Sequence, residues 1–114
     1  MNWHVLAARA ADDKLASNTI VLDVGDVVGI TDHFIITSGS SRRQVRAIAE
    51  GIEADLKLVG GPSPKRIEGL REAEWILLDF GIFVVHVFGE ETRRYFDLER
   101  LWQDCNRVEW LETN

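Results

Sequence analysis

Residues 34–59, FIITSGSSRRQVRAIAEGIEADLKLV, decide the fold class of this chain. The stretch opens with β-branched and aromatic residues, Phe34 to Ser38, which predict a strand. Ser41 is followed three residues later by Gln44, the spacing of a capping box, in which each side chain satisfies a free backbone N–H at the start of a helix. Apolar residues then recur every three or four positions with charged residues between them. The stretch therefore predicts a strand that leads directly into a long amphipathic helix.

The chain before this unit has the patterns of one helix and one strand. Residues 3–15 are rich in alanine, and their apolar residues are spaced by three and four, which predicts a short amphipathic helix. Residues 19–24 are β-branched and apolar and are closed by Gly25, so we expect a strand. Residues 26–32, with valines and Gly29, predict an irregular turn or bulged ribbon.

The chain after the long helix predicts a sheet edge, a hairpin and a final helix. Prolines and charges around residues 65–68 are typical of a short edge strand. Two apolar runs, residues 75–80 and 83–88, flank Gly81 and predict a hairpin. Residues 90–102 are expected to be helical at their start, and residues 103–114 lack periodicity and are candidates for fraying. Residues 1–114 therefore predict a single α/β (α+β) domain, with a mixed sheet of about five strands and flanking helices.

Composition limits the classes of function. The net charge of −6 argues against a protein that binds bare nucleic acid, because such proteins neutralise phosphates with Lys and Arg. A basic protein surface is the expected partner. The single Cys105 excludes an intrachain disulfide, and no apolar run approaches the ~20 residues of a membrane-spanning helix. We therefore expect a cytoplasmic protein that does not enter a membrane.

Residues 39–41, Gly-Ser-Ser, are the strongest candidate for enzyme chemistry, because a strand that runs into a helix N-terminus can hold a phosphate. A Walker-type loop would also need a Lys directly before its Ser or Thr, which is missing here. Nucleotidyl transfer needs paired carboxylates on a following strand to hold Mg²⁺, whereas the next acids, Glu50, Glu53 and Asp55, lie inside the helix. The histidines are scattered without ligand spacing, so no metal, cofactor or catalytic residue is expected. A nucleotide-binding or nucleotidyltransferase-like enzyme remains the alternative.

Trp75 is the main candidate for a binding residue. Strand alternation places it on one face with Leu77 and Asp79, although the pattern does not decide whether that face is core or surface. If the ring is exposed, it is a natural interface anchor, and Trp75→Ala should then weaken binding by at least ~2 kcal/mol. His86 lies in the next strand and is expected to approach Asp79 if the hairpin register allows it.

Seven stretches, in order from residue 21 to residue 102, together resemble the ribosomal silencing factor family, also called the Iojap-related family. They are residues 21–24 (VLDV), 30–39 (ITDHFIITSG), 41–45 (SRRQV), 67–69 (IEG), 73–79 (AEWILLD), 85–88 (VHVF) and 98–102 (LERLW). The resemblance implies a nucleotidyltransferase-like fold without catalytic carboxylates. It also implies a non-enzymatic translation repressor that binds large-subunit ribosomal protein fourteen and sterically prevents the two ribosomal subunits from joining under nutrient limitation. A homodimer of the free protein is implied as well.

The resemblance assigns the partner contacts to particular positions. Trp75 and Phe96 become the apolar anchors, and Asp79, Glu90 and Glu91 become candidate polar contacts. The family usually has Tyr at the position of Phe96, whereas here the preceding residue is the tyrosine, so Tyr95 is added to the predicted contacts. The family also often has Asp where this chain has Ile82. Residues 90–112 hold seven acids against four arginines, which suits a basic ribosomal protein.

Overall fold

The computed structural model describes residues 2–111, which form a single compact α+β domain built on a mixed six-stranded sheet. Its elements are α1 (Trp3–Asp13), β1 (Ser17–Asp23), α2 (Gly25–Val28), β2 (His33–Gly39), α3 (Arg42–Leu58), β3 (Arg66–Glu68), β4 (Trp75–Asp79), β5 (Phe83–Gly89), α4 (Glu90–Phe96), α5 (Leu98–Leu101) and β6 (Asn106–Arg107). The sheet order is β3-β4-β5-β2-β1-β6, with β2 and β5 parallel and the other neighbours antiparallel.

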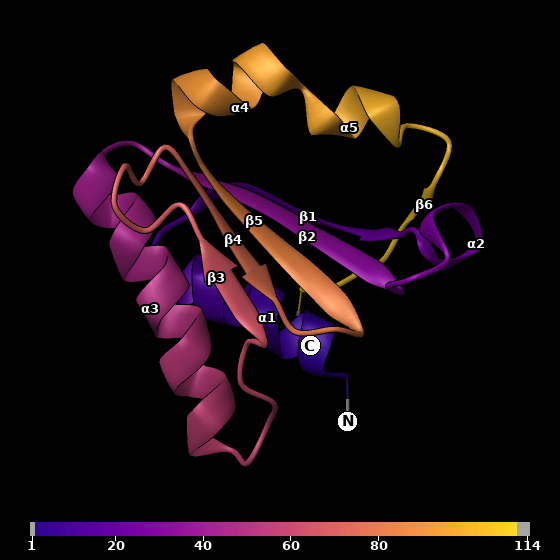
Figure 1. Ribbon diagram of the computed structural model, residues 1–114, viewed down its shortest axis with the longest axis horizontal. Coiled ribbons are helices and arrows are strands. Elements are labelled where there is room, and N and C mark those ends of the chain that lie inside the picture. Colours follow the sequence, from indigo (N-terminus) through magenta and orange to yellow (C-terminus); the bar gives the residue numbers. More distant parts are fainter. Residues whose placement is uncertain (1, 112–114) are drawn as a thin grey trace.

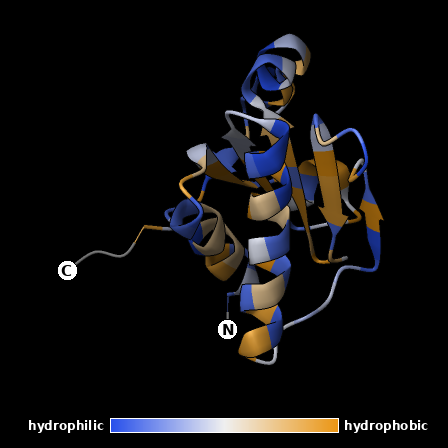
Figure 2. Cartoon of the chain, turned by 90° about the vertical axis from the view of Figure 1, so that its left-hand side faces the viewer, coloured by the Kyte–Doolittle hydropathy of each residue, from blue (hydrophilic) through white to orange (hydrophobic). Residues whose placement is uncertain are grey.

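The helices divide between the two faces of the sheet. α1 and α3 pack on one face and bury the main core, whereas α4 and α5 lie over the other face (Figure 1). Figure 2 shows the strands mainly as hydrophobic and α3 as a helix in which hydrophilic and hydrophobic residues alternate. The hydrophobic stripe of α3, with Ile48, Ile52 and Leu56, is fully buried against the sheet. The amphipathic helix predicted from residues 41–59 is thus confirmed.

The cap of α3 differs in one detail from the predicted capping box. Ser41 Oγ accepts a hydrogen bond from the backbone N–H of Gln44 at 3.1 Å, as expected. The return bond comes from the N–H of Ser40, at 2.6 Å from Gln44 Oε1, and not from that of Ser41. Gln44 Nε2 also donates to the carbonyl oxygens of Lys14 and Leu15, at 3.3 and 3.0 Å. Because these bonds hold the amide toward the end of α1, the cap also joins α1 to α3.

The C-terminal segment corrects the expectation that residues 103–114 fray. β6 pairs antiparallel with β1 and becomes a sixth strand, where about five were expected. Trp110 packs on the main core, and its indole N–H donates to the carbonyl of Thr19 at 3.0 Å. A two-residue strand followed by one anchoring tryptophan is too short to produce a periodic pattern, which is why the sequence did not predict it. Residues 112–114 of that segment lie outside the described part of the chain.

Residues 26–32 hold a second difference, because the turn or ribbon expected there begins as a single helical turn, α2. Gly29 ends this turn with φ +79°, a left-handed conformation that glycine adopts without a steric penalty. None of the helices within residues 2–111 is long and apolar enough to cross a membrane.

Candidate partner-binding face

The face of the sheet below α4 carries a cluster of rings, which we call the aromatic face. Its members are Phe34 on β2, Trp75 on β4, His86 and Phe88 on β5, and Phe96 on α4. Alternation along β4 and β5 explains the arrangement, because every second side chain points away from α1 and α3. Ring centroids of neighbouring members lie 4.8 to 6.2 Å apart. The cluster is therefore a second, smaller apolar layer opposite the main core.

Trp75 lies partly in this layer and partly at its surface. The β4 side chains Ile76 and Leu78 are fully buried against the main core, so the opposite side of the strand belongs to Trp75 and Leu77. Both of these residues are half-buried. The sequence did not decide whether Trp75 is a core or a surface residue. In the structure its ring packs on that of Phe88, with the two centroids 4.8 Å apart, and still reaches solvent.

Phe96 covers the other side of Trp75, with the two ring centroids 4.9 Å apart. The Phe96 side chain remains 47% exposed, and the neighbouring Tyr95, in edge contact with it, is 81% exposed. The order of Tyr95 and Phe96, which is the reverse of the order expected from the family, therefore has a structural consequence. The ring without a hydroxyl group packs on Trp75 at a tilt, and the tyrosine is presented to solvent.

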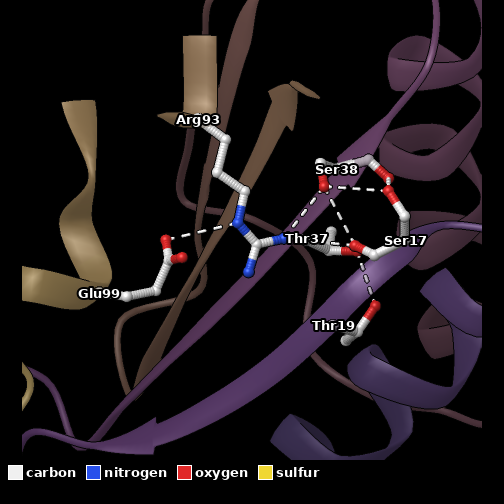
Figure 3. Close-up of polar contacts among 6 residues, drawn as sticks. All are labelled: Ser17, Thr19, Thr37, Ser38, Arg93 and Glu99. Atoms are coloured by element: carbon white, nitrogen blue, oxygen red, sulfur yellow. Dashed lines mark hydrogen bonds and ion pairs between the residues drawn. The ribbon is translucent and has the colours of Figure 1, made fainter. Parts of the chain in front are cut away.

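Arg93 holds α4 against the sheet, and sequence reasoning did not single it out. Its Nη1 donates to Ser38 Oγ at 3.0 Å and to the carbonyl of Ser17 at 3.2 Å, and its Nε donates to Glu99 at 3.4 Å (Figure 3). Although it is an arginine, the residue is only 8% exposed. Because Arg93 is three residues before Phe96, its bonds to β1 and β2 position the helix that carries the exposed ring. An arginine in a short polar helix gives no local signal of burial, so only the fold reveals it.

His86 is bonded to Trp75, and the hairpin register explains why. The register pairs His86 with Leu77 and Asp79 with Val84, so the hypothesis of a His86–Asp79 pair does not describe the hydrogen bonding. The indole N–H of Trp75 donates to His86 Nδ1 at 3.1 Å. Burial lowers the pKa of His86 to about 4, so the imidazole is neutral near pH 7. The neutral ring helps to orient the tryptophan.

The three predicted acidic contacts lie at different places. Asp79 is at the far end of β4 from Trp75, about 13 Å away at ~3.3 Å per residue. Its Oδ1 accepts the N–H of Gly81 at 2.8 Å. Glu90 and Glu91 occupy the first turn of α4, where negative charge is favoured by the helix dipole, and both are exposed. The structure thus brings Trp75, Phe96 and Tyr95 together, with Glu90 and Glu91 on the same helix, and leaves Asp79 apart.

The loop of residues 39–41 uses its polar groups internally. Gln44 Oε1 accepts both the backbone N–H and the hydroxyl of Ser40, at 2.6 and 2.9 Å. A Cβ added to Gly39 would lie 3.2 Å from three atoms of α3, so the glycine is needed for tight packing. The adjoining pocket is lined by three acids, Glu74, Glu90 and Glu91, against two arginines, Arg42 and Arg94, so it lacks the net positive charge that would favour a phosphate. Within residues 2–111, no group of three or more His, Cys, Asp or Glu is placed to hold a metal ion.

Comparisons with known proteins found one matching family model and several similar sequences and structures. The family model described as "Ribosomal silencing factor during starvation" matches residues 3–114. The chain is 43% identical over 100 residues to the ribosomal silencing factor RsfS of Bacillus subtilis, covering 88% of this chain and 84% of that protein. It is also 43% identical over 107 residues to the protein of the same name from Halalkalibacterium halodurans, covering 91% and 88%. A crystal structure of a Chromobacterium violaceum protein is similar at a TM-score of 0.84 and 35% identity, covering 89% of this chain and 83% of that chain.

Proposed function

The chain belongs to the ribosomal silencing factor family, and from this membership we propose that it binds the large ribosomal subunit through large-subunit ribosomal protein fourteen and sterically prevents the small subunit from joining. The family membership itself gives the chain a ribosome-associated silencing role. Ribosomal silencing factors are regulatory proteins without enzymatic activity, so the prediction of a non-enzymatic protein is confirmed. We further propose that the protein acts in the cytoplasm and represses translation under nutrient limitation.

The contact between the rings of Trp75 and Phe96 is the observation that carries the proposed interface. The two rings come from a strand and a helix far apart in the sequence, pack at 4.9 Å and together remain accessible. Aromatic residues of this kind carry a large share of the energy in many protein interfaces. The Arg93 bonds and the Trp75–His86 bond hold both rings in place before binding. A preorganised surface loses little conformational entropy when a partner binds.

The charge of the chain supports a basic partner. The net charge is −6, and the exposed acids Glu90 and Glu91 lie in the first turn of α4, the helix that ends with Phe96. Ribosomal proteins are commonly basic, so attraction between the two surfaces would speed association. This contribution would weaken as salt is added, because the Debye length falls to about 8 Å at physiological ionic strength. Tyr95 and Asp79 complete the set of proposed contacts.

We also propose that the free protein is a homodimer and that the aromatic face takes part in both associations. An exposed aromatic surface on an isolated protein tends to be covered by a second copy. Ribosome binding would then require the dimer to dissociate. Sedimentation equilibrium of the protein, with and without large subunits, would measure this exchange.

Co-sedimentation with purified large subunits tests the proposal. Small subunits are then added, and the fraction of whole ribosomes is measured on a sucrose gradient. We expect stoichiometric binding and reduced subunit joining. Absence of binding at low salt would contradict the proposal for this protein.

A matched pair of variants links the result to the aromatic face. Trp75→Ala should lose large-subunit binding, whereas Leu58→Ala, at an apolar residue 84% exposed at the end of α3, should retain it. Circular dichroism of both variants controls for unfolding. Equal loss of binding in the two variants would show that exposed apolar area in general, and not this face, is responsible.

A further inference from the structure

A pocket of about 360 Å³ lies between the segment that follows α2 and the β4–β5 hairpin, and it shares Phe34 and His86 with the aromatic face. We call it the hairpin pocket. Its walls include the apolar side chains of Phe34, Leu77 and Val84, and its polar lining includes Thr31 and His86. The volume is within the range of sites that bind small molecules. Apolar walls with a few convergent polar groups are typical of such sites.

Two buried polar atoms of the lining residues have no hydrogen-bond partner within residues 2–111. They are Thr31 Oγ1 and His86 Nε2, in side chains that are 7% and 5% exposed. Because the indole N–H of Trp75 donates to His86 Nδ1, the proton of the neutral ring lies on Nε2. His86 therefore offers an N–H donor, and Thr31 offers a hydroxyl group that can also donate. Buried groups of this kind are unfavourable unless they find a partner.

The rim of the pocket carries two cations, Lys65 and Arg66, against one carboxylate, Asp79, so it has a net positive charge in an otherwise acidic protein. Lys65 and Arg66 both line it, and the Lys65 side chain lies directly over Gly81. Arg66 forms ion pairs with two carboxylates, from its Nε to Glu68 Oε2 at 3.5 Å and from its Nη2 to Asp79 Oδ2 at 3.9 Å. These carboxylates largely neutralise its charge. Among the described residues, no carboxylate lies within ion-pair distance of Lys65. One ammonium group therefore lines the same pocket as two neutral donors.

We propose that the hairpin pocket binds a small carboxylate with a short, branched apolar body. The carboxylate oxygens would accept hydrogen bonds from His86 Nε2 and Thr31 Oγ1 once the lining side chains that cover these two buried atoms shift, and would lie near the Lys65 ammonium. The apolar body would pack against Phe34, Leu77 and Val84. A phosphate ester is a poorer fit, because a dianion buried among apolar walls needs more than one unpaired cation.

Titration of the full chain with isocaproate, followed by nitrogen–proton correlation NMR, tests the proposal. We expect saturable shifts of the Thr31 amide and the His86 ring with a millimolar dissociation constant, which is ordinary for a ligand of this size. Isohexanol, which has the same body without the charge, should bind at least about tenfold more weakly. Equal binding of the alcohol, or shifts that do not saturate, would overturn the proposal. The titration uses no ribosomes, so its outcome is independent of the function proposed above.

Matched variants separate the pocket from nonspecific attraction. Lys65→Met should weaken isocaproate binding by about fivefold, whereas Lys57→Met, at an exposed lysine in the last turn of α3, should leave it unchanged. Thr31→Val should also weaken binding without loss of thermal stability, because it removes an unpaired buried hydroxyl group. Equal effects of the two lysine variants, or unchanged binding to Thr31→Val, would contradict the proposed site.

Discussion

Replacing Phe96 by alanine separates the two roles that the aromatic face combines. The ring contributes to the fold through its contact with Trp75, and it contributes to the proposed interface through its exposed half. The first contribution is limited by the exposed fraction, which is 47%. The second is not limited in this way, because a partner would cover the part of the ring that solvent now reaches. Phe96→Ala should therefore affect binding more clearly than folding.

The loss of folding stability follows from the half-buried ring. Full burial of a phenylalanine side chain contributes up to about 3 kcal/mol, so half of it contributes about 1.5 kcal/mol. The ring pair with Trp75 adds about 1 kcal/mol. A loss of about 2.5 kcal/mol is smaller than the ~5–15 kcal/mol by which domains are usually stable. The variant should remain folded, with a melting temperature lowered by roughly 10 °C.

The loss of binding follows from the behaviour of interface anchors. Removal of such an anchor costs at least about 2 kcal/mol, which corresponds to about a 30-fold weaker affinity for the large subunit. The affinity is measured by titrating labelled protein with purified large subunits at a temperature where the variant is folded. Leu58→Ala, at an exposed apolar residue of α3, is the control. A folded Phe96→Ala protein that binds as tightly as the parent would refute the reasoning, because the ring would then not be part of the contact.

Three further predictions concern stability and its dependence on pH. Arg93→Met should lower the free energy of unfolding in urea by about 2–4 kcal/mol, because it removes three hydrogen bonds of a buried guanidinium, to Ser17, Ser38 and Glu99, whereas Arg94→Met at the exposed neighbour should change it little. Burial lowers the pKa of His86 from 6.5 to about 4, so the unfolded chain binds a proton that the folded chain does not. The stabilisation present above pH 6.5 is then lost as the pH falls toward 4, by up to about 3 kcal/mol, and His86→Gln should remove this component from the urea midpoints measured across that range. Gly69→Ala should destabilise strongly, because its φ is +86° and a Cβ would overlap the backbone carbonyl at the start of β4. Gly29→Ala, with a similar φ but open space around it, should cost only about 1 kcal/mol in the same assay.

Local patterns predicted much of the architecture. The Ser41 cap, the helix that follows it and the edge position of residues 66–68 all agree with the structure. The alternation along β4 correctly grouped Trp75 with Leu77, opposite Ile76. These features depend on residues within one or two turns or one strand of each other, so their physical causes are visible in short stretches of sequence.

The candidate site was only partly accessible from the sequence. The family resemblance pointed to Trp75 and Phe96, and the structure places their rings in contact. It did not point to Arg93, whose partners lie 55 and 76 residues away in the chain. The hairpin pattern placed His86 near Asp79, and both residues do line one pocket, but the side-chain hydrogen bond of His86 is with Trp75, because a hairpin register cannot be read from two apolar runs alone.

The sequence by itself determined most of the helices and strands, the family and the absence of paired catalytic carboxylates after the Gly39 loop, but not α2 or β6. Only the tertiary structure decided that β2 and β5 pair in parallel, that β6 pairs with β1 as the edge strand, and that Phe96 contacts Trp75. The physical reason is the range of the interactions. Capping, periodicity and alternation act between near neighbours and are visible in the order of residues along the chain, whereas sheet order, a buried arginine and the Trp75–Phe96 contact depend on where distant segments meet.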